Sequence, residues 1–215
     1  KCSPASGRTS TPKGTENLQR ERIGHVNAIP MQAGLGPSKL IAIRSGSYDY
    51  AEVDLASSIQ LVGPNNAGKT TLINTLQFLY LDNRNQMAFG DHDPEATRAY
   101  YFPDHFSYLL FELEGPQGPY VLGWRGQSKA QGGDPIRFTY DGRYDMKDFM
   151  SADGRVLDPK KVDAKLGDRN FRVLRDAAGH REAILVATKG ESNGLGVVHL
   201  TESDRYAHFK EVLKN

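Results

Sequence analysis

The predicted fold is decided by Gly63-Pro64-Asn65-Asn66-Ala67-Gly68-Lys69-Thr70, a stretch that fits the pattern G-x-x-x-x-G-K-[ST]. Gly63 and Gly68 carry no Cβ, so the chain can curl with its backbone amides pointing inward, as a phosphate-rich ligand requires. The Lys69 ammonium would meet the outer phosphates, and the Thr70 hydroxyl is the expected Mg²⁺ ligand. The pattern therefore predicts a phosphate-binding loop (P-loop) for a nucleoside triphosphate with Mg²⁺.

The flanking residues favour this interpretation over a glycine-rich turn that matches by chance. Residues 58–62 form an apolar run typical of a buried strand, and residues 71–79 carry apolar side chains at helical spacing. A P-loop lies between a strand and a helix, so the phosphates would lie at a helix N-terminus, where the dipole favours negative charge. Both flanks required by the motif are thus predicted.

Composition and charge narrow the classes of protein. The 215 residues give room for one sizeable core, and a formal net charge of +1 gives no general argument for nucleic-acid binding. Cys2 is the only cysteine, which excludes a disulfide within these residues and a thiolate metal site, and which fits a cytoplasmic setting. No apolar run approaches membrane-spanning length, so we expect a soluble protein without membrane contact.

The chain divides into three predicted parts. Residues 1–37 are rich in Ser, Thr, Pro, Gly and charge, which is typical of a disordered tail. Residues 38–200 form the P-loop domain, and within it residues 82–104 are a polar connection long enough to be functional. Residues 201–215 form an amphipathic helix that no Gly or Pro closes, so we expect the start of a longer, coiled-coil helix. Strands are predicted at 39–45, 48–55, 106–114, 120–125 and 136–140, with a hairpin joining 106–114 to 120–125 and a short helix at 159–166.

The order of these segments resembles a known family. Arg44-Ser45 after an apolar strand, a second strand, and the P-loop followed by Thr-Leu-Ile-Asn-Thr-Leu resemble the N-terminal head segment of the coiled-coil ATPases of the structural maintenance of chromosomes (SMC) class. Residues 106–114, 120–127 and 136–141 most resemble the MukB-like branch, which includes the JetC subunit of Wadjet plasmid-defence systems. The resemblance is strong around the P-loop and weak after residue 141. Asn66 stands where the family usually carries Gly, but a small polar residue can adopt left-handed geometry, so we expect binding to survive.

The resemblance implies an α/β P-loop NTPase of the ABC/SMC-head type, with a mixed sheet that has an antiparallel hairpin part and flanking helices. It implies ATP and Mg²⁺ as cofactors and Lys69 and Gln127 as catalytic residues, with Thr70 and Gln127 at the metal. Gln127 would be the Q-loop glutamine, whose amide offers an acceptor to the metal and a donor to water; Gln131 is an alternative. The implied nucleotide contacts are Arg44, Ser45, Gly63, Pro64, Asn65, Asn66, Ala67, Gly68, Lys69, Thr70 and Thr71.

Two motifs of an ATP-hydrolysing head are absent from this sequence. No apolar run ends in Asp-Glu, and no Ser-Gly-Gly signature opens a helix. In SMC-like proteins both lie in the C-terminal head half, beyond a long coiled coil. The resemblance therefore implies an ATPase only as part of the full-length protein, which acts on DNA in chromosome organisation or in plasmid or phage defence. It also implies the C-terminal head half, a second head across sandwiched ATP, kleisin-like subunits and DNA as partners.

Two functions of other classes stay open. One is a self-contained GTPase-like switch, because Asp176-Ala177-Ala178-Gly179 matches D-x-x-G, although no Asn-Lys-x-Asp guanine reader exists. The other is a non-hydrolysing nucleotide-binding module that serves as a dimerisation surface. The histidines are scattered without metal-ligand spacing. Basic residues gather in one region but interleave with acidic ones, which favours a solvated face over DNA contact: Lys160, Lys161, Lys165, Arg169, Arg172, Arg175 and Arg181.

Overall fold

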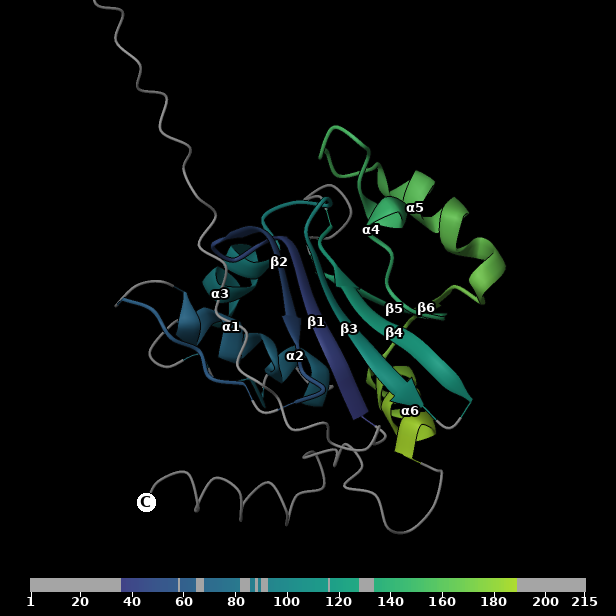
Figure 1. Ribbon diagram of the computed structural model, residues 1–215, viewed down its shortest axis with the longest axis horizontal. Helices are drawn as coiled ribbons and strands as arrows, with labels where there is room; N and C mark the ends of the chain where they lie inside the picture. Colours follow the sequence, from purple (N-terminus) through teal and green to yellow (C-terminus); the bar gives the residue numbers. More distant parts are fainter. Residues whose placement is uncertain are drawn as a thin grey trace, which may run out of the picture.

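A six-stranded sheet organises the described part of the chain (Figure 1). The computed structural model describes residues 36–57, 59–64, 68–81, 86–87, 89, 93–115, 117–127 and 134–188. Residues 1–35 of the tail expected at 1–37, and the coiled-coil helix expected at 201–215, lie outside these residues. The elements in chain order are β1 (Gly36–Ser45), β2 (Tyr48–Asp54), α1 (Lys69–Thr75), α2 (Gln77–Tyr80), α3 (Pro94–Tyr101), β3 (Tyr108–Gly115), β4 (Gly118–Arg125), β5 (Ile136–Asp141), α4 (Met146–Phe149), α5 (Pro159–Leu166), a 3-10 turn (Gly167–Arg169), β6 (Arg172–Leu174) and α6 (Ala177–Thr188).

The sheet is antiparallel throughout the described residues, with the order β2-β1-β3-β4-β5-β6. The expected hairpin is confirmed by the pairing of β3 with β4, in which Gly115 lies opposite Gly118. The prediction of a mixed sheet is wrong for this part of the chain. The pairs are antiparallel because β1–β2, β3–β4 and β4–β5 follow one another directly and reverse direction, while β3 runs in the same direction as β2 and pairs with β1 on its other side.

The strand expected before the P-loop does not form. Residues 59–62 have no regular secondary structure, and Ile59, Leu61 and Val62 are exposed, Val62 to 82%. A strand needs a neighbour that accepts and donates backbone hydrogen bonds. No described strand pairs with residues 59–62, so this apolar run lies outside the sheet.

Other boundaries differ in smaller ways. β1 begins at Gly36, so it takes in Gly36 and Pro37, which the sequence assigned to the tail. The helix expected at 71–79 is two helices that meet at Leu76, and the helix expected at 159–166 is confirmed as α5. The connection at 82–104 contains α3, which begins with a proper cap: the Asp93 carboxylate accepts hydrogen bonds from the amides of Glu95 and Ala96, and Pro94 is the first helical residue.

Helices cover both faces of the sheet (Figure 1). Strand residues alternate between the faces, so Leu40 and Ala42 of β1 point to one and Ile41 and Ile43 to the other. The first face packs against α1, α2, α3 and α6, and its largest residues include Phe78, Tyr101, Phe102, Phe111 and Trp124. The second face packs against α4 and α5 through Phe149, Val162 and Leu166. The sheet is therefore the middle of three layers.

No helix within the described ranges combines the length and the apolar character that crossing a membrane would need.

Candidate nucleotide-binding site

The predicted P-loop ends where α1 begins. Gly68 precedes the helix with a φ of 83°, a left-handed conformation that glycine adopts at no steric cost. The Lys69 ammonium turns back over the loop and donates to the carbonyl oxygens of Gly63 and Pro64, both at 2.6 Å. Asn65, Asn66 and Ala67 lie outside the described residues. The ammonium is thus held at the mouth of the loop by weak neutral acceptors, which an anionic ligand could replace.

Two tyrosines hold the segment that follows the loop. The Tyr48 hydroxyl of β2 donates to the Gly68 carbonyl at 3.0 Å, and the Tyr101 hydroxyl of α3 donates to the Thr71 carbonyl at 3.0 Å. Desolvation by burial, and then the nearby Tyr100, raise the pKa of Tyr48 above its ordinary value of 10.0. The Tyr48 hydroxyl therefore keeps its proton at neutral pH and stays a donor. A Cβ on Gly68 would lie only 2.6 Å from this hydroxyl, so the close approach requires glycine.

The turn between β1 and β2 brings the end of β1, which carries the predicted contacts Arg44 and Ser45, close to the segment that follows the P-loop. The Gly46 amide donates to the Tyr100 carbonyl at 3.2 Å, and a Cβ on Gly46 would lie 3.0 Å from the methyl group of Thr71. Arg44 and Ser45 directly precede this contact. Ser45 is buried, and its hydroxyl has no hydrogen-bond partner among the residues that the structure describes. An unsatisfied buried hydroxyl beside the P-loop segment is a place where a ligand or water would gain a hydrogen bond.

Arg44 adopts an unusual backbone conformation. Its φ of 46° lies in the left-handed region that side chains other than Gly, Asn and Asp rarely enter. Its guanidinium donates to the Asp104 carboxylate at 2.7 Å and lies 5.8 Å from the centre of the Phe106 ring. Arg44 and Asp104 are both partly exposed, and such a pair contributes only about 0–1 kcal/mol to stability. The pair therefore orients the guanidinium more than it stabilises the fold.

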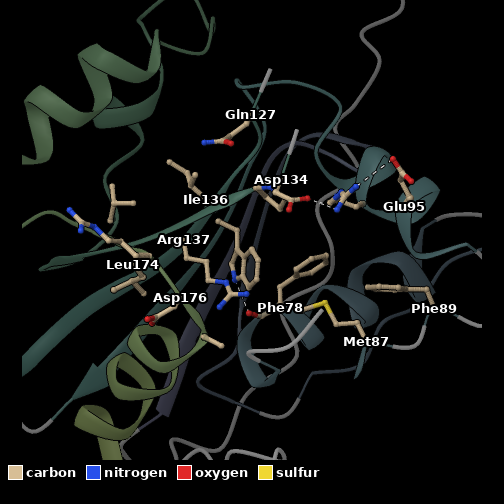
Figure 2. Close-up of a pocket in the computed structure, with 16 residues that line it drawn as sticks. Phe78, Met87, Phe89, Glu95, Gln127, Asp134, Ile136, Arg137, Leu174 and Asp176 are labelled. Carbon is tan, nitrogen blue, oxygen red and sulfur yellow. Dashed lines mark hydrogen bonds and ion pairs between the residues drawn. The ribbon is translucent and has the colours of Figure 1, made fainter. Parts of the chain in front are cut away.

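The predicted Q-loop residue, Gln127, lies in a different cavity from Thr70 and Thr71. Figure 2 shows Gln127 at the rim of a pocket of about 770 Å³, with Phe78, Met87 and Phe89 on the opposite side from Leu174 and Asp176. Inside this pocket Arg98 pairs with Asp134, and the Arg137 guanidinium lies 4.4 Å from the centre of the Trp124 ring. Thr70 and Thr71 line a separate cavity, and only Phe89 borders both.

The residue before Gln127 nevertheless lies against Asp104, the partner of Arg44. Gly126 precedes Gln127, and its amide donates to the Ser107 carbonyl at 2.9 Å. A Cβ on Gly126 would lie 2.0 Å from the carbonyl oxygen of Asp104, the residue that pairs with Arg44. The end of β4 thus lies against the residue that orients the predicted nucleotide-contacting arginine. Gln131 lies outside the described residues.

Sequence reasoning missed the aromatic residues around the P-loop segment. Tyr48 lies in the strand predicted at 48–55, and Tyr100 and Tyr101 lie in the polar connection predicted at 82–104. A local signal is present in Asp93-Pro94-Glu95, a helix-start pattern that predicts a helix beginning near Pro94.

Other motifs from the sequence have local structural roles here. The Asp176 carboxylate accepts from the Gly179 amide at 2.8 Å, so the D-x-x-G match caps the start of α6. Arg169, one of the gathered basic residues, donates to Asp148 at 2.7 Å and lies over the Tyr140 ring. Within the described ranges, no group of three or more His, Cys, Asp and Glu side chains could hold a metal ion.

Comparison with known proteins gives one family. No curated protein matches the chain. A family model described as "Putative Mks condensin complex protein MksF" matches residues 31–189, which is well over half of the chain and spans the P-loop pattern and every described element. The match supports the relation to SMC-like condensins that the sequence indicated, and its description names a component of a complex and no ligand. The chain belongs to the MksF family of condensin complex proteins.

Proposed function

We propose that this chain is the nucleotide-binding part of an SMC-like component of a condensin complex, and that it binds ATP with Mg²⁺ through Gly63–Thr71, Arg44 and Ser45. In this proposal the chain is an N-terminal head half with an ABC-type P-loop fold. Hydrolysis needs the C-terminal head half, and two heads close over ATP. Family membership supports the role in a chromosome-organising complex, in which kleisin-like subunits and DNA are the proposed partners.

The observation that carries the proposal is the position of the Lys69 ammonium. It lies over the carbonyl oxygens of Gly63 and Pro64 at the start of α1, in a sequence that fits the phosphate-binding pattern. Charge-assisted hydrogen bonds to phosphate are stronger than those to neutral carbonyls. A triphosphate would therefore draw the ammonium from the loop carbonyls onto its outer oxygens without a change in the fold.

The residues around the loop fit Mg²⁺ and the rest of the nucleotide. Thr70 is exposed in the first turn of α1, and the buried Ser45 hydroxyl lacks a hydrogen-bond partner among the described residues. Mg²⁺ in such sites is held mainly by phosphate oxygens and water, with one or two protein ligands, so the lack of a carboxylate cluster in the described part is no obstacle. Bound Mg²⁺ would supply charge neutralisation on the phosphates, and Thr70 would be its ligand from this chain.

The exposed apolar run before the P-loop supports the proposal that a strand from another segment pairs with it. Ile59, Leu61 and Val62 are exposed, are interrupted only by Gln60, and lead directly into Gly63. Contiguous exposed apolar side chains mark interaction sites in soluble proteins. We propose that a strand of the C-terminal head half pairs with residues 59–62 and so fixes the start of the loop.

Calorimetry with Lys69→Ala tests the proposal, with Lys160→Ala as the matched control. Lys160 is exposed on α5, whose partly buried and buried residues face the opposite side of the sheet from α1. We expect Lys69→Ala to abolish binding of ATP·Mg²⁺ without loss of helical and strand signal in circular dichroism, and Lys160→Ala to bind like the parent. Equal ATP affinity of the Lys69→Ala variant and the parent would contradict the proposal, and a preference for GTP would favour a GTPase-like switch instead.

A further inference from the structure

A cavity lies between α1 and α3, beside the first residues after the P-loop. It has a volume of about 450 Å³, within the range of small-molecule sites. One wall is the face of α1 that presents Thr70, Thr71 and Asn74, and the other wall is aromatic, with Phe89, Tyr100 and Tyr101. The cavity is therefore rich in aromatic rings on one side, beside Ala96 and Thr97 of α3, and carries hydroxyl and amide groups on the other.

Tyr100 is the aromatic residue that the fold leaves available for a ligand. Its hydroxyl lies 3.4 Å from the Thr71 hydroxyl, and its ring packs so close to Gly46 that an added Cβ there would lie 3.3 Å from it. The ring meets Tyr101 edge-on, with 5.2 Å between the two ring centres. Despite these contacts Tyr100 remains 43% exposed. A fixed but exposed ring at the border of a cavity is suited to stacking against a flat aromatic group.

We infer that this cavity takes the base of the bound nucleotide, with Tyr100 as the stacking residue. The inference rests on the proposed function, because the cavity is placed by two residues of the phosphate-binding stretch, Thr70 and Thr71. A ligand whose phosphates contact Lys69 and Thr70 has its nucleoside end within reach of the adjoining wall. Aromatic stacking tolerates any base, so Tyr100 supplies affinity, and the hydroxyl and amide groups of Thr71 and Asn74 supply the edge contacts.

The larger pocket at Gln127 is the competing place for the base, and its lining favours it less. There Arg98 pairs with Asp134 and Glu95, and the Trp124 ring already carries the Arg137 guanidinium on its face. A base stacked on Trp124 would have to displace Arg137. Tyr100 has no cation over its ring among the described residues.

The test compares ATP with inorganic tripolyphosphate, which carries the phosphates without a base. We expect Tyr100→Leu to weaken ATP binding about tenfold or more, as loss of base stacking does, and to leave tripolyphosphate binding unchanged. Tyr100→Phe keeps the ring and should bind ATP nearly like the parent, whereas Lys69→Ala should lose both ligands. Equal losses of ATP and tripolyphosphate in Tyr100→Leu, or no loss of either, would overturn the inference but leave the proposed function standing.

Photolabelling locates the base without relying on affinity. Irradiation of the parent chain with 8-azido-ATP, followed by trypsin and tandem mass spectrometry, should place the label on Tyr100 or Tyr101, near the start of the tryptic peptide 99–125. Excess ATP should prevent the labelling, and excess tripolyphosphate should prevent it as well. A label on Trp124 or within residues 126–137 would put the base in the pocket at Gln127 and overturn the inference. Absence of any binding by ATP and tripolyphosphate would overturn the proposed function, and the inference with it.

Discussion

Replacement of Gly126 by alanine should damage the link between the end of β4 and the predicted nucleotide contacts. The added methyl group would lie 2.0 Å from the carbonyl oxygen of Asp104, 3.0 Å from its carbonyl carbon and 3.3 Å from the Cβ of Phe102. These neighbours are backbone atoms or lie next to the backbone, so no side-chain rotation relieves the clash. The two chain segments must separate by more than 1 Å for ordinary contact, which is about the difference between 2.0 Å and a normal carbon–oxygen separation.

The cost can be estimated from two contributions. Overpacking a tight site costs about 1–3 kcal/mol, and the rigid neighbours place this site at the upper end. Separation also strains the hydrogen bond from the Gly126 amide to the Ser107 carbonyl, which contributes about 1 kcal/mol. We therefore expect Gly126→Ala to lower the free energy of unfolding by about 3 kcal/mol, and to lower Tm by roughly 6–12 °C, since 1 kcal/mol corresponds to about 2–4 °C at this size.

Gly167→Ala is the matched control, because it adds the same methyl group without a neighbour. Gly167 ends α5 with a φ of −53°, and nothing lies within 4 Å of the added Cβ. We expect no destabilisation and a gain of up to about 1 kcal/mol from the restricted unfolded chain. Urea unfolding followed by circular dichroism measures both variants. Stability of Gly126→Ala within about 0.5 kcal/mol of the parent, the range of neutral surface changes, would refute the packing argument.

Two further predictions concern tyrosine hydroxyls. Burial raises the pKa of Tyr108 from 10.0 to about 12, so the folded chain keeps this proton where the unfolded chain releases it. The contribution of this hydroxyl to the free energy of unfolding is complete below pH 10 and falls by up to about 2.7 kcal/mol as the pH rises to 12. Urea unfolding at a series of pH values measures this fall, and Tyr108→Phe should reduce it. Tyr48→Phe removes the hydrogen bond to the Gly68 carbonyl, which still accepts from the Leu72 amide, so we expect a loss of only about 0.5–1 kcal/mol. Faster hydrogen exchange at residues 69–72 should accompany that loss, and unchanged exchange would show that Tyr48 does not hold the segment.

Strands and one helix could be predicted because their signals are local. β1, β3, β4 and β5 are apolar runs bounded by turn residues, and α5 has Pro159 in its first turn. α3 could not be predicted in the same way, because its apolar side chains are two alanines and the two tyrosines at its end, and it lies within an otherwise polar stretch. β6 is only three residues long, and its Val173 is exposed, so no apolar alternation marks it.

The candidate site was likewise predictable only where its signal is local. The phosphate-binding stretch is recognisable from its own residues, whatever lies around it. The contacts of Tyr48 with Gly68 and of Tyr101 with Thr71 join residues 20 and 30 positions apart, and the contact of Asp104 with Arg44 spans 60. Which tyrosine reaches the loop depends on the register of β1 with β2 and on where α3 ends. Neither can be read from a motif, so the aromatic wall becomes visible only in the folded chain.

The two ends of the predicted P-loop are held in different ways. The C-terminal end is fixed within the described chain, because the Tyr48 and Tyr101 hydroxyls donate hydrogen bonds to the backbone carbonyls of Gly68 and Thr71. The start of the loop follows an apolar run that no described strand pairs with, and each of its exposed side chains would gain up to about 1.5–3 kcal/mol on burial. Both faces of the sheet already have their cores, so the run is not needed to stabilise them. A strand that pairs with residues 59–62 would therefore fix the start of the loop before the nucleotide binds. The nucleotide then loses less free energy to ordering the loop, so its affinity should be higher in the assembled complex than in this chain alone.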